Sequence, residues 1–278
     1  MPQHFGGKTW SVPLDRTGIM GILNCTPDSF SDGGKYLDPL QAIRHGKALA
    51  AAGADIVDIG GQSTRPGYRP ISPQEEWERI APVILGLRQA LPALILSVDS
   101  FYPAVAKKAL LAGVQILNDV TGFSAEMMSV ASDSDCGCIL MHPRRITQGD
   151  ILTEVRDFFR TKQAQAESFG IRKSRLCMDP GIGFGKRHPD NLRLIANVQR
   201  TKLPDIAYLM ALSKKRVIGI PCNRPPFDQR LSGTLAANTV AILGGANLLR
   251  VHDVREARQA ALVTDALLAA SCDPSCGL

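Results

Sequence analysis

Short apolar runs alternate with longer segments of helical periodicity along almost the whole chain. The runs are rich in β-branched and aliphatic residues, as expected of buried strands, whereas the longer segments repeat apolar residues every three to four positions. Strands are expected at residues 18–23, 55–59, 94–98, 115–117, 137–141, 175–178, 206–212 and 248–251. Helices are expected at residues 39–52, 73–91, 102–112, 124–132, 151–169, 189–198, 231–243 and 254–269.

Capping residues mark several of the helix boundaries. Ser72 precedes Pro73, and Glu75 stands three residues after Ser72, which is the pattern of an N-cap with proline in the first turn. Gly53 and Gly113 follow Ala-rich segments, where a helix typically ends on a left-handed residue. These signals support the alternation of strands and helices.

Eight strand–helix units in 278 residues predict a parallel sheet covered by helices. This number of units is typical of an α/β fold of the (β/α)8 TIM-barrel class. A doubly wound open sheet is the alternative that the pattern alone leaves open. We expect a single domain over residues 1–278, in which the barrel occupies about 17–270 with short N- and C-terminal extensions.

The composition excludes several classes of protein. Apolar residues make up 45% of the chain and charged residues 21%, a balance that excludes intrinsic disorder. No apolar run reaches the roughly 18 residues of a membrane span, and residues 1–10 contain no apolar segment of a secretory signal. A cytoplasmic protein without membrane contact is therefore expected. The seven cysteines are an odd number, which indicates free thiols rather than a disulfide framework.

The net charge of +6 bears on the choice of partner. The longest basic run, residues 214–216, has few aromatic residues near it, so no nucleic-acid surface is expected. A positive charge suits a small anionic substrate equally well. Only the residues of the site decide between these partners.

Polar residues follow every predicted strand almost at once. They are Asn24, Gln62 to Arg65, Asp99 and Ser100, Asn118 and Asp119, His142, Asp179, Ser213 to Lys215, and His252 and Asp253. A single polar residue there is as readily a helix cap. In a barrel, however, all the strand ends converge on one mouth, where active sites are built. The sequence therefore predicts an enzyme with a polar pocket of mixed charge.

Asp99, Asn118 and Asp179 lie at the ends of three different strands. Two carboxylates and an amide that face one flat ligand recognise both its donors and its acceptors, as a pterin or a purine requires. A metal site is the alternative, although the histidines are too scattered to favour it. The glycine-rich segment 181–185 follows Asp179 and either lets the backbone approach a ligand closely or forms a flexible turn.

Arg250 and His252 alternate with Val251 on a predicted strand, so both side chains lie on the same side. A guanidinium beside an imidazole binds anions such as phosphate or diphosphate. Asn24 begins a polar loop, residues 25–36, whose paired glycines suit a lid over an active site. Oxygen ligands in this loop suit Mg²⁺, which usually accompanies substrate phosphates.

Seven stretches of the chain closely resemble the motifs of dihydropteroate synthases, and they occur in the order of that family. The stretches are residues 21–34, 60–67, 97–100, 118–120, 179–186, 213–215 and 250–253. The resemblance implies a (β/α)8 barrel that joins 4-aminobenzoate to (7,8-dihydropterin-6-yl)methyl diphosphate in folate biosynthesis, releasing 7,8-dihydropteroate and diphosphate. It also implies Mg²⁺ as cofactor, a cytoplasmic homodimer and inhibition by sulfonamides.

The resemblance further implies roles for individual residues on the pterin side of the site. The residues that would hold the pterin ring are Asp99, Asn118, Asp179 and Lys215. Three of them, Lys215, Asp99 and Asp179, would also take part in catalysis.

The remaining assignments concern the diphosphate, the metal and the amine. Arg250 and His252 would bind the diphosphate, and Asn24 would ligate Mg²⁺. A second loop, which helps to form the aminobenzoate site in this family, contributes Thr64, Arg65 and Pro66.

Several positions depart from the pattern of the family, mostly around the amine substrate. Gln62 stands where the family usually has Glu, and residues 143–145 (Pro-Arg-Arg) replace the usual sequence after the histidine. Ala211 and Arg216 stand where Gly and Ser are usual, and Lys214 replaces Arg. None of these changes removes a residue assigned to the pterin or the diphosphate, so they bear on the amine site and on sulfonamide sensitivity.

Two other functions are compatible with parts of this pattern. The first is a catalytically weak, pterin-binding paralogue, although a pure pterin binder has no use for Arg250 and His252. The second is a pterin-dependent methyltransferase domain of a related barrel type, which has no use for the segment 63–66.

Overall fold

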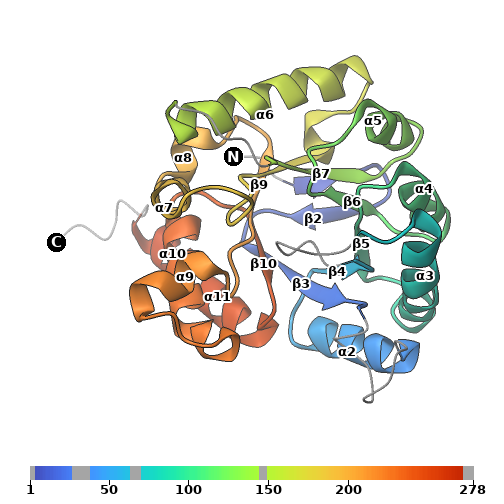
Figure 1. Cartoon of the computed structure of the whole chain (residues 1–278), viewed down its shortest axis with the longest axis horizontal. Coiled ribbons are helices and arrows are strands. Elements are labelled where there is room, and N and C mark those ends of the chain that lie inside the picture. The colour runs from blue at the N-terminus through green and yellow to red at the C-terminus, as the bar shows by residue number, and fades with distance from the viewer. Residues whose placement is uncertain (1–3, 27–37, 63–69, 144–148, 272–278) are drawn as a thin grey trace.

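The computed structural model describes residues 4–26, 38–62, 70–143 and 149–271. Its centre is a closed barrel of eight parallel strands in the order β10-β3-β4-β5-β6-β7-β8-β9 (Figure 1). The strands are β3 (Gly18–Asn24), β4 (Ile56–Gly60), β5 (Ile95–Asp99), β6 (Ile116–Asp119), β7 (Gly137–Met141), β8 (Leu176–Asp179), β9 (Ala207–Met210) and β10 (Leu248–Val251).

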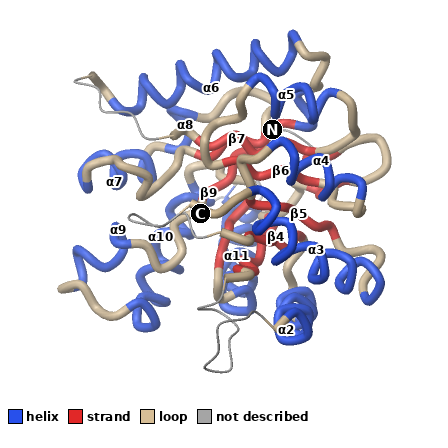
Figure 2. Tube along the Cα trace, turned by 45° about the vertical axis from the view of Figure 1, so that its right-hand side comes forward, coloured by secondary structure: helices blue, strands red, loops and turns tan. Residues whose placement is uncertain are grey.

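Helices surround the strands on the outside (Figure 2). They are α2 (Pro39–Ala51), α3 (Pro73–Ala90), α4 (Pro103–Leu111), α5 (Ala125–Ser132), α6 (Ile151–Ser168), α7 (His188–Ala196), α8 (Val198–Thr201), α9 (Arg216–Gly219), α10 (Leu231–Leu243) and α11 (Val254–Ser271). Three short 3-10 helices are η1 (Lys173–Arg175), η2 (Ile220–Cys222) and η3 (Phe227–Arg230).

The predicted (β/α)8 barrel is confirmed, and the alternative of an open sheet is wrong. Leu248 lies opposite Gly18 and Val251 opposite Gly21, so the last strand pairs with the first and closes the barrel. Most predicted boundaries differ from the observed ones by one or two residues, and the helix expected at 189–198 is divided between α7 and α8. The important difference is that β5 and β6 extend to include Asp99 and Asn118. These candidate site residues therefore belong to the strands rather than to the loops after them.

A short antiparallel hairpin, β1 (His4–Gly6) and β2 (Ser11–Pro13), precedes the barrel. The apolar pattern does not predict it, because each strand has only three residues. Phe5 and Val12 of the hairpin are buried and belong to one cluster with the apolar side chains inside the barrel, among them Ile56 and Leu248. Because Ile56 and Leu248 begin their strands, the hairpin covers the N-terminal end of the barrel and leaves the carboxyl end open for a site.

The interior of the barrel changes from apolar to polar along the strands. Alternate residues of a strand face inward. In β4, Ile56 belongs to the apolar interior cluster, whereas Asp58, two residues further on, is a fully buried carboxylate. In β6, Ile116 and Asn118 repeat this change. The buried polar layer thus lies toward the carboxyl ends of the strands, where barrel enzymes build their sites.

The capping signals in the sequence are confirmed. The Ser72 hydroxyl accepts a hydrogen bond from the Glu75 amide at 3.1 Å, and Pro73 is the first residue of α3. Gly53 and Gly113 follow α2 and α4 with φ of 103° and 93°. Glycine adopts this left-handed region without the steric cost that a side chain would bring.

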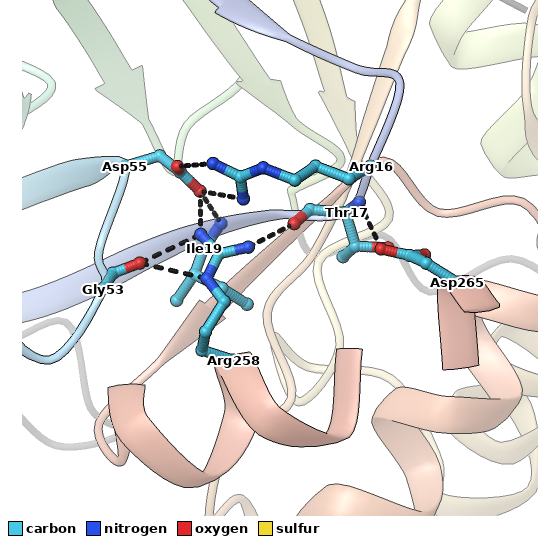
Figure 3. Close-up of polar contacts among 7 residues, drawn as sticks. All are labelled: Arg16, Thr17, Ile19, Gly53, Asp55, Arg258 and Asp265. Carbon is cyan, nitrogen blue, oxygen red and sulfur yellow. Dashed lines mark hydrogen bonds and ion pairs between the residues drawn. The ribbon is translucent and has the colours of Figure 1, made fainter. Parts of the chain in front are cut away.

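A polar network fastens the last helix to the N-terminal ends of the first strands (Figure 3). Asp55, just before β4, accepts from Arg16 Nη2 at 2.6 Å and also pairs with Arg258 of α11. Arg258 Nη1 donates to the Thr17 carbonyl at 2.8 Å, and Asp265 accepts from the Thr17 amide at 2.8 Å. The network therefore stabilises the closure of the barrel at the end opposite to the polar layer.

The described residues include five cysteines, all free thiols: Cys25, Cys136, Cys138, Cys177 and Cys222. Within the same residues, no helix combines the length and the apolar character needed to cross a membrane.

Candidate active site

Arg250 joins two carboxylates in the polar layer of the barrel. Its Nε donates to Asp58 Oδ2 at 2.6 Å, and its Nη2 donates to Asp99 Oδ2 at 2.7 Å. The Asp58 side chain is fully buried, whereas the Asp99 side chain is 12% exposed. Burying a carboxylate is costly unless hydrogen bonds or an opposite charge offset the loss of solvation, and the guanidinium supplies both to Asp58 and Asp99.

Asn118 shares the carboxylate of Asp58. Its Nδ2 donates to Asp58 Oδ2 at 3.0 Å, the same oxygen that accepts from Arg250. An ionised carboxylate only accepts hydrogen bonds, so Asn118 must direct its NH₂ group toward Asp58. The amide oxygen of Asn118 is then available to another donor.

The strand-end pattern of the sequence did not identify Asp58, although it is central to this site. Asp58 lies within β4 rather than at its end. The available signal was a carboxylate in the middle of an apolar strand, at the inward position that alternates with Ile56. A buried charge at such a position requires a partner, and Arg250 and Asn118 supply it.

Asp179, the last residue of β8, organises the glycine-rich turn that follows it. Its Oδ1 accepts from the Gly181 amide at 2.7 Å. Gly181 and Gly183 have φ of 68° and 83°, and a Cβ on Gly181 would collide with the carbonyl oxygen of His142. The turn itself therefore requires glycine, whatever ligand approaches it.

Lys215 reaches from the segment after β9 to this same turn. Its Nζ donates to the Ile182 carbonyl at 2.6 Å and lies 4.9 Å from the ring centroid of Phe184. Loss of solvation lowers the pKa of the Lys215 ammonium to about 8, and the negative charge of Asp179 opposes this change. The structure thus brings Lys215 and Asp179 into one electrostatic group.

Burial also raises the pKa of the two acids assigned to catalysis. The pKa of Asp99 rises to about 7 through loss of solvation, against the attraction of Arg250. The pKa of Asp179 rises for the same reason, against the charge of Lys215. Perturbed acids and bases gathered in one place are typical of catalytic sites.

His252 follows β10 and has different neighbours from Arg250. Its Nδ1 lies 3.0 Å from Ser213 Oγ, and its ring packs edge-on against Phe227 with 5.2 Å between centroids. Arg250 instead bonds across the barrel to Asp58 and Asp99. The two residues of the predicted anion site therefore lie close in sequence but are held by separate contacts.

Asn24, the last residue of β3, is the candidate ligand for Mg²⁺. Its Oδ1 and the Oδ2 of Asp99 both lie beside Gly60, each within 4 Å of where a side chain on that glycine would begin. Among the residues that the structure describes, no three or more His, Cys, Asp or Glu side chains gather into a metal cluster. A single amide oxygen beside a carboxylate nevertheless fits Mg²⁺, which keeps several waters and takes its other ligands from substrate phosphates.

Thr64, Arg65 and Pro66 lie outside the described residues, and so do residues 27–37 of the first polar loop and Arg144 and Arg145. The residues that flank segment 63–69 are described. Gln62 Oε1 accepts from the Ile71 amide at 2.9 Å, and the Tyr102 hydroxyl donates to the Ile71 carbonyl at 2.8 Å. Gln62, a departure from the family pattern, thus anchors the backbone at Ile71.

The other departures lie on the β9 side of the barrel. Ala211 is buried, and Arg216 begins α9 with an exposed side chain. Lys214 Nζ pairs with Asp253 Oδ1 at 2.8 Å and lies 5.4 Å from the ring centroid of Phe227. Lysine at position 214 therefore keeps an ion pair with Asp253.

Residues 20–252 match the family described as pterin binding enzyme. A dihydropteroate synthase of Synechocystis sp. is 41% identical over 262 residues, which cover 91% of this chain and 90% of that protein. A Xanthomonas albilineans dihydropteroate synthase solved with 4-aminobenzoic acid has a TM-score of 0.91 and 39% identity, covering 99% of this chain and 100% of its own. The same enzyme in complex with 7,8-dihydropteroate has a TM-score of 0.88 and 38% identity, with 98% and 100% covered. With matches that span almost its whole length, the chain belongs to the pterin-binding enzymes and, among them, to the dihydropteroate synthases.

Proposed function

We propose that the polar layer of this barrel condenses (7,8-dihydropterin-6-yl)methyl diphosphate with 4-aminobenzoate. The bond between the pterin methylene and the diphosphate oxygen breaks, and a bond from the methylene to the amine nitrogen forms. The amine loses one proton, and the products are 7,8-dihydropteroate and diphosphate. We assign this transferase reaction of folate biosynthesis to a single domain that comprises the barrel.

The pterin ring is assigned to Asp99, Asn118, Asp179 and Lys215. Ionised Asp99 and Asp179 accept hydrogen bonds, Lys215 donates them, and Asn118 offers its amide oxygen because its NH₂ group is engaged by Asp58. The edge of a pterin presents both donors and acceptors in one plane. A set of acceptors with one cationic donor is suited to this edge and fixes the orientation of the ring.

The diphosphate is assigned to Arg250 and His252. Negative charge develops on the departing oxygen, so cationic donors stabilise the transition state more than the bound substrate. Arg250 uses Nε and Nη2 for Asp58 and Asp99, and the described residues provide no partner for its Nη1. That nitrogen is the part of the guanidinium that can donate to an anion. Asn24 would hold Mg²⁺, which when bound supplies further positive charge against the diphosphate.

Departure of the diphosphate leaves positive charge on the pterin methylene and its ring. Asp99 and Asp179 then stabilise this charge as neighbouring anions, while Lys215 keeps the ring in place. The weakly basic amine attacks the methylene directly, so no side chain of the protein serves as a nucleophile. Thr64, Arg65 and Pro66 are proposed to help form the aminobenzoate site.

We also infer a cytoplasmic homodimer that binds its small-molecule substrates but neither nucleic acid nor a membrane. Helices α10 and α11, which pack side by side, expose several large apolar side chains: Val240, Leu243, Leu262, Val263 and Leu267. Apolar side chains exposed in such number on adjacent helices are typical of a protein interface, and a second copy of the chain would cover them. Sedimentation of the purified protein tests this inference.

The observation that carries the proposed function is Arg250 bonded to both Asp58 and Asp99, with Asn118 joined to the same group. The purified protein, both substrates and Mg²⁺ should yield dihydropteroate and diphosphate in equal amounts, measured by mass spectrometry and by a coupled diphosphate assay. Chelation with EDTA should abolish the reaction, and added Mg²⁺ should restore it. Absence of dihydropteroate at saturating substrates contradicts the function, whereas full activity in EDTA contradicts only the metal.

A further inference from the structure

We propose that Asp58 is a positioning residue that sets the Arg250 guanidinium for the diphosphate and the Asn118 amide for the pterin at the same time. The inference rests on the proposed function and names a residue that the motifs of the sequence do not single out. Because the Asp58 side chain is fully buried, it acts on the substrate through Arg250 and Asn118 rather than by contact.

The first consequence concerns the plane of the guanidinium. The Nε of Arg250 donates to Asp58 and its Nη2 donates to Asp99, so one hydrogen of Nη2 and both hydrogens of Nη1 remain. Nη1 has no partner among the described residues, and it shares an edge of the group with one hydrogen of Nη2. Two parallel donors on one edge match two oxygens of a phosphate group. The Asp58 bond therefore fixes the plane of the guanidinium and leaves Nη1 available for a phosphate oxygen.

The second consequence concerns the amide of Asn118. An amide is able to present either its oxygen or its NH₂ group to the pocket, and its neighbours decide which. Asp58 accepts from Nδ2 at 3.0 Å and has no hydrogen to donate, so the NH₂ group must face Asp58. The oxygen of Asn118 is thereby presented to the ligand as an acceptor.

One buried oxygen thus controls two groups that bind different halves of one substrate. A carboxylate with a purely structural role would not affect the binding of either half. Strand β6, which is separated from β4 by β5, supplies an example. Asp119 of β6 is also fully buried, but it accepts from the Thr121 amide at 2.6 Å and from the Phe123 amide at 3.1 Å. It contacts neither Arg250 nor Asn118 through these bonds, so it is a matched control with the same residue type and burial.

The test is Asp58→Asn beside Asp119→Asn, with binding measured by calorimetry for two separate probes. The probes are inorganic diphosphate with Mg²⁺ and a 6-hydroxymethyl-7,8-dihydropterin without diphosphate. Asp58→Asn should bind each probe at least tenfold more weakly than the unmodified protein. Asp119→Asn should bind both within about twofold of the unmodified protein, although its thermal stability falls. Unchanged affinity of Asp58→Asn for both probes, or for either one, overturns the joint role.

The outcome also separates this inference from the proposed function. If the unmodified protein binds neither probe, the proposed function is contradicted. If it binds both, and Asp58→Asn binds them equally well, only the role of Asp58 is contradicted.

Should Asp58→Asn fail to fold, the unmodified protein still provides a test. Nitrogen-15 NMR of the ligand-free protein detects the Nε–H of Arg250. Its signal is identified because it is missing from the spectrum of Arg250→Lys. This hydrogen should exchange with solvent at least 100-fold more slowly than the Nε–H of Arg44, whose side chain is 70% exposed. Exchange as fast as that of Arg44 overturns the bond to Asp58 on which the proposal depends.

Discussion

The guanidinium of Arg250 donates to the carboxylate of Asp99 at 2.7 Å and so joins β10 to β5 across the barrel. These strands are not neighbours, because β3 and β4 lie between them in the sheet. The ion pair therefore crosses the carboxyl end of the barrel rather than running along one side. In the proposed reaction, its two members bind different parts of one substrate, and this arrangement leads to the predictions that follow.

Replacing Arg250 with Lys keeps the charge but removes the planar fork of donors. We expect the affinity for inorganic diphosphate to fall by tenfold or more, since losing a hydrogen bond between charged groups costs about 1.5–3 kcal/mol. Affinity for a pterin without diphosphate should change by less than about threefold. Calorimetry with each ligand checks this, and an equal loss for both ligands would argue against anion binding by Arg250.

The pH dependence of stability should report the raised pKa of Asp99. Folding raises this pKa to about 7, from about 3.9 in an unfolded chain. Between these values the folded protein retains a proton that the unfolded chain has released, so this carboxyl makes stability fall as pH rises from about 4 to 7. Asn does not titrate, and Asp99→Asn should show a smaller decline over that interval.

Urea unfolding of the unmodified protein and of Asp99→Asn, at several values of pH from 4 to 8, measures this difference. Other buried acids contribute in both proteins, so the comparison isolates Asp99. Parallel curves for the two proteins would mean that Asp99 titrates in the folded state as it does in the unfolded chain.

Tyr102→Phe removes only the hydroxyl that donates to the Ile71 carbonyl at 2.8 Å. Ile71 lies just beyond the segment that carries Thr64 and Arg65, so we expect the KM for 4-aminobenzoate to rise about fivefold, equivalent to a lost hydrogen bond of about 1 kcal/mol. The KM for the pterin diphosphate should not change. Ser72→Ala is the control, because it removes the N-cap of α3 next to Ile71 without touching this bond. An equal rise in KM for Ser72→Ala would assign the effect to α3 instead.

Arg258→Met should lower stability without altering catalysis. Arg258 donates to the Thr17 carbonyl at 2.8 Å and pairs with Asp55 at the end of the barrel opposite the site. Removing a mostly buried cation with these partners should lower the free energy of unfolding by about 2–4 kcal/mol. Arg255→Met is the control, because Arg255 is exposed on the same helix, and it should lower the free energy of unfolding by less than about 0.5 kcal/mol. Unfolding curves and steady-state kinetics at 25 °C test both statements. A changed KM in a fully folded Arg258→Met would show that the two ends of the barrel are coupled.

Much of the fold could be predicted from the sequence because the buried strands of a (β/α)8 barrel are short continuous apolar runs, which alternate with segments of helical periodicity. The polar residues after each strand also located the site, since parallel strands bring their carboxyl ends together. The hairpin β1–β2 could not be predicted because strands of three residues are too short to show a pattern of apolar residues. The short helix α9 could not be predicted for the same reason, since its four residues make little more than one turn.

The contacts within the site were less predictable than its location. Asp58 is not predictable from the sequence because its role depends on Arg250, a residue 192 positions away, and no local pattern indicates such a pairing. The sequence likewise suggested that Arg250 is available to an anion, whereas the structure shows two of its nitrogens bonded to carboxylates. Side-chain packing across the barrel decides which donors of Arg250 remain available to a ligand. The alternation of residues along one strand does not reveal this packing.

A crystal structure of the protein with the pterin diphosphate, Mg²⁺ and no amine tests the central claim most directly. The account predicts the pterin ring within hydrogen-bonding distance of Asp99, Asn118 and Asp179, with the diphosphate on Arg250 and His252 and Asp58 still bonded to Arg250. A pterin bound at the carboxyl end but with its diphosphate directed away from Arg250, or a ligand bound anywhere else on the barrel, would contradict the account.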